Sequence, residues 1–147
     1  MEKNKLIAMH FIRIAPSMIR AVKAEIQIAA DGQITHPQYR ILASIDRGNF
    51  TVSQIAIDHG VSQPAMSKMV DLLVKKGLIK RSYVSKDRRQ IDLKLSAKGL
   101  VLFKELKNKA AKNLAKKIKV ISKKEQNSLN KSLDQLETFL MKIKKDN

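Results

Sequence analysis

Two groups of polar side chains have the types and spacing that contact with a nucleic acid requires. The first group consists of Ser62, Gln63, Pro64, Ser67 and Lys68, at the expected N-terminal end of a helix. A glutamine can pair with the edge of adenine through two hydrogen bonds, whereas serine and lysine can bind phosphate or guanine. A solvated helix face with no binding role would carry the same residue types, and this alternative stays open.

The second group consists of Asp87, Arg88 and Arg89, in a polar and basic segment between two expected strands. Two arginines at the tip of a hairpin can enter a narrow minor groove of DNA, because its negative potential attracts them. Basic turns are also common on surfaces that bind nothing. The combination of this basic tip with the polar helix end favours double-stranded DNA as the partner, bound with sequence preference.

A short helix and a turn are expected just before the first group. Thr51 and Gln54 have the spacing of a capping box, in which each side chain bonds the backbone N–H of the other residue. The helix should span residues 52–59 and end at Gly60, because glycine adopts the left-handed conformation at little cost. The small residue Ala56 and the glycine four positions later have the spacing of a helix-turn-helix.

A second helix is expected to carry the first group on its exposed face. Ser62 is its predicted N-cap, Pro64 lies in its first turn, and Gly77 should end it. Apolar residues with helical spacing form its predicted buried stripe. They are Met66, Met69, Val70 and Leu73.

A hairpin of two strands is expected to carry the second group. The predicted strands are residues 80–84 and 90–95, and the second alternates apolar Ile91, Leu93 and Leu95 with polar residues. Residues 85–89 would then be the solvent-exposed connection. Upstream, Thr35 should cap another helix of about residues 36–46, whose predicted inward residues are Tyr39, Leu42, Ala43 and Ile45.

Three motifs in this stretch resemble the winged helix-turn-helix of MarR-type regulators, the multiple antibiotic resistance regulator family. They are Gly77-Leu78-Ile79 after the second helix, Asp87-Arg88-Arg89 in the hairpin, and Leu95-Ser96-Ala97-Lys98-Gly99 after it. The resemblance extends over nearly the whole chain. It implies that Asp87 orients Arg89 toward DNA, with Arg88 as the alternative reader of the groove.

Composition limits the class of protein and its partners. The chain has 147 residues, with 30 Lys and Arg against 13 Asp and Glu, which gives a formal charge of +17. Such an excess favours polyanionic partners, either nucleic acid or an anionic membrane surface, although compositional bias accounts for part of it. Cysteine is absent, which excludes a disulfide framework and a thiol sensor.

Several other classes of function have no sequence signature here. No apolar run reaches the roughly 20 residues of a membrane span, and no signal peptide is recognisable. No glycine-rich phosphate loop and no Gly-x-Ser-x-Gly is present. His10, His36 and His59 are scattered without the spacing of metal ligands. We therefore expect a cytoplasmic protein that is not an enzyme, with no metal, no cofactor and no membrane partner.

The outer segments predict long helices that join two copies of the chain. Residues 3–30 have helical periodicity, and Pro16 inside them should kink or split the helix. A helix from Ser96 to about Val120 follows the hairpin, and a capping box of Ser122 and Glu125 begins the last one. That last helix carries an apolar seam of coiled-coil type. Its predicted interface residues, with two from the first helix, are Ile7, Phe11, Leu129, Leu133, Leu136, Leu140 and Ile143.

The sequence therefore predicts a mainly α-helical (α+β) winged helix-turn-helix. The expected organisation is a single domain, with residues 1–34 and 96–147 as dimerisation helices and residues 35–95 as the DNA-binding lobe. The resemblance further implies a homodimer on a pseudo-palindromic operator and a small aromatic effector. The residues that could line its site are His10, Ile14, Met18, Tyr39 and Phe103, and ordinary core packing explains each equally well. Two rivals stay open: a non-specific architectural DNA-binding protein, and a module bound to an anionic membrane through basic amphipathic helices.

Overall fold

The computed structural model describes residues 2–48, 50–84 and 87–145, without the side chains of residues 83, 84, 87–90, 144 and 145. The chain divides into two compact units, Met1–Ala111 and Lys112–Asn147, and we describe each by itself. No helix of the described residues is both long enough and apolar enough to cross a membrane.

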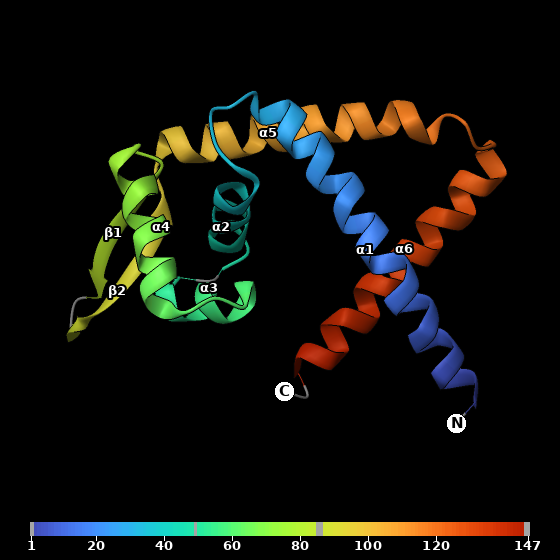
Figure 1. Cartoon of the computed structure of the whole chain (residues 1–147), viewed down its shortest axis with the longest axis horizontal. Coiled ribbons are helices and arrows are strands. Elements are labelled where there is room, and N and C mark those ends of the chain that lie inside the picture. Colours follow the sequence, from blue (N-terminus) through green and yellow to red (C-terminus); the bar gives the residue numbers. More distant parts are fainter. Residues whose placement is uncertain (1, 49, 85–86, 146–147) are drawn as a thin grey trace. The chain divides into compact units, whose positions relative to one another are not determined.

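Helices dominate both units, as the sequence predicts, and the described residues contain one two-stranded antiparallel sheet (Figure 1). The mainly α-helical winged helix fold is thereby confirmed. The elements are α1 (Glu2–Ala30), α2 (His36–Asp46), α3 (Val52–His59), α4 (Gln63–Lys75), β1 (Ile79–Val84), β2 (Asp87–Leu95), α5 (Ala97–Ile118) and α6 (Lys123–Lys145).

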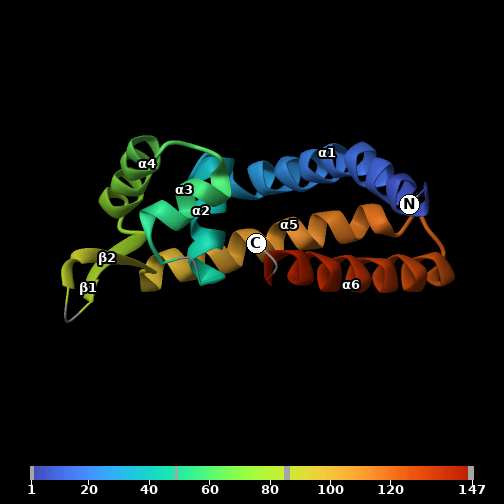
Figure 2. The same cartoon turned by 90° about the horizontal axis from the view of Figure 1, so that it is seen from below.

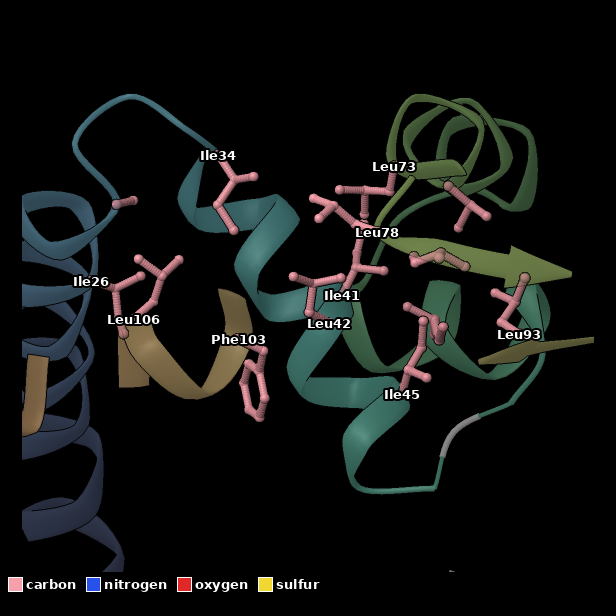
Figure 3. Close-up of a cluster of buried hydrophobic side chains, with 14 of the residues drawn as sticks. Ile26, Ile34, Ile41, Leu42, Ile45, Leu73, Leu78, Leu93, Phe103 and Leu106 are labelled. Atoms are coloured by element: carbon pink, nitrogen blue, oxygen red, sulfur yellow. The ribbon is translucent and has the colours of Figure 1, made fainter. Parts of the chain in front are cut away.

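Helix α2 lies at the centre of the core of the first unit. Its Ile41 and Leu42 have no exposed surface, and Ser44 between its buried apolar residues has none either. Figure 3 shows side chains meeting α2 from two sides. From α1 and α5 these are Ile26, Phe103 and Leu106. On the other side they are Leu73 of α4, Leu78 of the link between α4 and β1, and Leu93 of β2. Because α2 is covered on both sides, its buried surface is wider than the predicted stripe, which omitted Ile41.

Helix α1 runs through Pro16 without interruption, so a split into two helices is wrong. Its last turns carry the buried residues Ile26, Ala29 and Ala30, which join the core. Most apolar residues before them in α1 are exposed and retain 42% to 75% of their accessible surface. These exposed residues are Leu6, Ile7, Met9, Ile12, Ile14, Met18, Ile19 and Val22.

The second unit contains the end of α5 and the whole of α6. The predicted capping box is present at the start of α6. The Ser122 backbone N–H donates to Glu125 Oε2 (2.7 Å), and the Glu125 N–H donates to Ser122 Oγ (3.3 Å). These two bonds fix the first turn of α6. The predicted seam is partly exposed, since Leu129, Leu133 and Leu140 retain 41% to 44% of their surface.

Candidate nucleic-acid interface

Helices α3 and α4 form the predicted helix-turn-helix, and the predicted caps are present. The Gln54 N–H donates to Thr51 Oγ1 (3.2 Å), and the Thr51 N–H donates to Gln54 Oε1 (3.1 Å). Gly60 ends α3 with φ 64° and ψ 35°, in the left-handed region where a side chain would be strained. The Val61 N–H then donates to the Ala56 carbonyl (3.1 Å), which fixes the turn into α4.

The packing of these two helices determines which face of α4 is exposed. Ile55 of α3 and three members of the predicted stripe on α4 are fully buried, and Met69 is half-buried. The three are Met66, Val70 and Leu73. The opposite face of α4 is therefore held toward solvent by a rigid core rather than by its own propensity.

The polar residues of the first group lie on that outer face at the N-terminal end of α4. Ser62, Gln63, Pro64 and Lys68 are exposed, and Ser67 is half-buried. Ser62 Oγ accepts a hydrogen bond from the Ala65 N–H (3.3 Å), so it caps the helix and keeps its hydroxyl proton for another acceptor. The helix dipole makes this end electropositive, which favours a phosphate there.

An ion pair that the sequence did not reveal links α4 to the hairpin. Arg81 of β1 donates through Nη2 to Asp71 Oδ1 of α4, and both side chains are partly exposed. Asp71 is the only acidic residue of α4. Its charge next to DNA would repel phosphate, but the guanidinium neutralises it. The sequence shows that the two residues have opposite charges, but whether they pair depends on how the hairpin packs against α4.

The hairpin is longer on its second strand than the sequence predicts. Residue 79 pairs with 95 and each step follows in register up to Tyr83 with Ile91, after which Val84 pairs with Asp87. Asp87, Arg88 and Arg89 thus have their backbone in β2 and not in the connection, contrary to the prediction. The shift at this point is an irregularity of the bulge type, which places extra residues on one strand. In Figure 2 the hairpin extends beyond α4.

The side chains of Asp87, Arg88 and Arg89 lie outside the described part of the structure, so the predicted contact between Asp87 and Arg89 stays a prediction. The base of the hairpin contacts the segment before α3. Leu93 is fully buried, and its N–H donates to the carbonyl of Phe50, in the segment before α3 (2.6 Å). The hairpin is therefore fixed to the helix-turn-helix by packing and by a backbone hydrogen bond.

A partly buried polar contact joins α2 to the end of α3. Ser44 Oγ lies 3.2 Å from His59 Nε2, and Arg47 Nη2 donates to the same hydroxyl (3.3 Å). Burial lowers the pKa of His59, and the charges of Arg40 and Arg47 lower it further, against a smaller opposing effect of Asp58 and of a hydrogen bond to the Arg40 backbone. The neutral imidazole is therefore the form that this contact favours.

A cavity of about 630 Å³ lies between α1, α2 and α5 in the first unit. Three residues of the predicted effector site line it, namely Met18, Tyr39 and Phe103, whereas His10 and Ile14 do not. The rings of Tyr39 and Phe103 are 5.4 Å apart between centroids. The remaining lining residues are Ile19, Val22, His36, Arg40, Ala43, Asp46, Arg47 and Lys107.

This cavity has an aromatic wall and a mostly basic rim. Lys107 Nζ lies 5.9 Å from the centroid of the Phe103 ring, within the range of a cation–π contact. Burial raises the pKa of the Tyr39 hydroxyl, which stays a neutral donor at pH 7. Burial, together with the charges of Arg40 and Lys23, lowers the pKa of His36. Within residues 2–48, 50–84 and 87–145, no group of three or more acidic or histidine side chains could hold a metal ion.

Comparison with known proteins gives consistent matches over this region. The model of the MarR family matches residues 34–91. The HTH-type transcriptional repressor MdtR of Bacillus subtilis (strain 168) is 35% identical over 97 residues, which cover 65% of this chain. The matched part spans only 58% of that relative.

Two solved structures illustrate the similarity of fold. The YusO protein from Bacillus subtilis is 26% identical with a TM-score of 0.66, and the match covers 92% of this chain and 96% of that one. A mutant of S. aureus MepR, solved bound to an oligodeoxyribonucleotide, is 19% identical with a TM-score of 0.61 over 91% of this chain and 97% of that one. At that identity the second match supports the fold alone.

Proposed function

The chain belongs to the MarR family of winged helix-turn-helix proteins, and we propose that it is a transcriptional regulator that binds a pseudo-palindromic DNA operator as a homodimer. The observation that carries this proposal is the exposed polar N-terminal end of α4, held outward by a buried core and flanked by the hairpin. That arrangement suits a helix lying in the major groove with a hairpin beside it.

Base contacts are proposed for the first turns of α4. Gln63 is exposed. It is neither the N-cap of α4 nor part of the buried core, so it is our candidate for bidentate pairing with adenine. Lys68 and the hydroxyl proton of Ser62 suit phosphate or guanine. Pro64 and Ser67 would shape the contact surface between them.

The hairpin is proposed to read the minor groove beside each half-site. Arg89 would enter the groove with Asp87 as its orienting partner, and Arg88 is the alternative reader. Arginine loses little on dehydration and suits a narrow A·T-rich groove. The Asp71–Arg81 pair supports this role, because it fixes the base of the hairpin to the helix that reads the major groove.

Dimerisation is proposed for the outer helices. Ile7 is 51% exposed on α1, and Phe11 beside it is half-buried. The partly exposed seam of α6 adds a second apolar surface with coiled-coil spacing. Its residues are Leu129, Leu133, Leu136, Leu140 and Ile143. A second copy of the chain would bury both surfaces and would place two α4 helices on one face of DNA.

A small aromatic effector is proposed for the cavity between α1, α2 and α5. Its volume of about 630 Å³ is in the range of small-molecule sites. Tyr39 and Phe103 offer aromatic surface, and the cations at the rim would favour a ligand that carries a negative charge.

The test is selection of binding sequences, followed by titration of wild type and Gln63→Ala. We expect two half-sites about 10 base pairs apart, centre to centre. Gln63→Ala should lose about 1–3 kcal/mol on the selected operator and should relax base preference at one position of each half-site. Gln27→Ala, which removes an exposed glutamine of α1, is the matched control and should leave the titration unchanged.

Two results would change this proposal. Equal affinity of the wild type for the operator and for a scrambled duplex at physiological salt would favour the architectural rival, in which charge alone drives binding. If Arg89→Ala weakens binding equally on A·T-rich and G·C-rich flanks and lowers the salt slope by about one unit, then Arg89 contacts phosphate and does not read the groove.

A further inference from the structure

Two of the short motifs that carry the family resemblance lie in contact with each other. One follows α4 at Gly77-Leu78-Ile79, and the other leads from β2 into α5. The Ser96 backbone N–H donates to the Leu78 carbonyl (3.0 Å), and the Ser96 hydroxyl donates to the Gly77 carbonyl (2.6 Å). Ser96 is buried, so these bonds are shielded from water. We call this contact the α4–α5 joint.

Gly99 brings the first turn of α5 against the backbone that leaves α4. Its N–H donates to Ser96 Oγ (2.9 Å), so one hydroxyl caps α5 and bonds the end of α4 at the same time. A Cβ atom at Gly99 would lie 2.0 Å from the Leu78 carbonyl oxygen and 2.9 Å from its carbon. No side chain fits there unless the two segments separate, because the clash is with backbone.

Two lysines extend the joint. Lys98 Nζ donates to the Lys76 carbonyl (3.2 Å), and Lys76 Nζ donates to the Gln33 carbonyl in the turn between α1 and α2 (2.8 Å). The C-terminal end of α4 is thus bonded to the beginning of α5 and to the segment that follows α1. Figure 3 shows Leu78 of this joint within the same buried cluster as α2.

The cavity described above lies on the helix that the joint holds. Phe103 and Lys107 of α5 line it, and they follow Gly99 by about one and two turns. A helix transmits a displacement along its axis, because its turns are hydrogen-bonded to one another. Anything that tilts α5 at the cavity therefore acts on the joint.

We propose that Ser96 and Gly99 are positioning residues that lock α4 to α5, so that α4 changes its orientation only together with α5. The inference rests on the proposed function, since it takes α4 as the helix that contacts DNA. It adds the contact that couples the orientation of α4 to that of α5, the helix whose Phe103 lines the cavity. The joint has two discrete parts, a shared hydroxyl and a close backbone contact, and each can be removed separately.

The first experiment measures the joint without DNA. The chain has no cysteine, so Lys68→Cys with Lys109→Cys gives one labelled pair across α4 and α5, both at exposed positions. Spin-labelled chain is diluted with excess unlabelled chain, so that only distances within one chain are read. We expect a narrow distance distribution in the parent, a broader one with Ser96→Ala, and a shifted mean with Gly99→Ala.

The controls separate a positioning role from ordinary loss of stability. Ser122→Ala removes the N-cap hydroxyl of α6 instead and should leave the α4–α5 distribution unchanged. Ser96→Thr keeps the hydroxyl and should restore the narrow distribution, which a mere packing role would not predict. If Gly99→Ala does not fold, Ser96→Ala still carries the test.

The second experiment tests whether the α4–α5 joint affects the affinity for DNA. Ser96→Ala should bind the two-half-site operator about tenfold more weakly and a single half-site as well as the parent, because one half-site places no demand on helix separation. Failure of the parent to prefer any operator would refute the proposed function, and the distance measurement would still decide on the joint. Unchanged distributions in both Ser96→Ala and Gly99→Ala would overturn the inference.

Discussion

The helix-turn-helix of residues 51–77 and helix α1 are both amphipathic, but they use their apolar residues differently. In α4, Met66, Val70 and Leu73 are fully buried against α3 and the hairpin. In α1, Ile12 and Ile19 are 75% and 62% exposed. Helical periodicity says which residues share a face and says nothing about whether that face is covered within the same chain. A covered face stabilises the fold, whereas an uncovered one is available for a second copy.

The largest effect should follow from creating a cavity beneath the covered face of α4. Leu73→Ala deletes three carbon atoms from a site with no exposed surface, and we expect a loss of about 3 kcal/mol in the free energy of unfolding. The loss should not depend on protein concentration, because the contacts lie within one lobe. Urea unfolding at two concentrations measures it, and a loss below about 0.5 kcal/mol would show that this core is not what holds α4.

A smaller and different effect should follow from charging the uncovered face. Ile7→Lys should weaken the dimer by about 2 kcal/mol or more, because it buries a cation in an apolar interface, and it should leave the monomer fold intact. Sedimentation across a concentration series is the measurement. Ile57→Lys on α3, at a position that is 78% exposed, makes the same charge change outside the outer helices and should not shift the equilibrium. A wild type that is monomeric at micromolar concentration would contradict the dimer.

The smallest effect should be a pH dependence confined to the lobe. The folded-state pKa of His59 is lowered below its ordinary value of 6.5, chiefly by burial, so the unfolded chain binds more protons at and below that pH. Stability is therefore fully present above pH 6.5 and is lost as pH falls below it. Thermal unfolding between pH 5 and 8 should show this slope reduced in His59→Gln. A slope identical to that of the wild type would exclude His59, and His36→Gln then tests the other histidine whose pKa burial lowers.

The sequence predicted most accurately the parts of the lobe that local chemistry decides. Thr51, Gly60 and Ser62 act within one helical turn of the chain, and their caps are where the pattern puts them. Ile41 was not predicted to be buried, because a periodic apolar pattern identifies one buried face and α2 is covered on two sides. The start of β2 at Asp87 depends on an irregular register, and strand pairing is not encoded by neighbours in sequence.

The cavity proposed for an effector shows the same limit. Met18, Tyr39 and Phe103 were named as lining residues on the family resemblance and do line the cavity, whereas His10 and Ile14 do not. These two residues lie nearer the N-terminal end of α1, and only the path of that helix in space decides which of its turns reaches α2. The basic rim of Arg40, Arg47 and Lys107 was not predicted, because these residues come from two helices distant in sequence.

The hydrogen bond from the Leu93 N–H to the Phe50 carbonyl has a consequence for the order in which the chain folds. An isolated two-stranded hairpin is at best marginally stable in water, so the β1–β2 hairpin needs this third backbone partner and the burial of Leu93. The partner is distant in sequence, and closing such a loop is slow compared with forming the capped helices. We therefore expect the helices to form early and the hairpin to dock late. Nascent chains that have not yet docked it would expose an unpaired strand edge, which is the surface through which such chains aggregate.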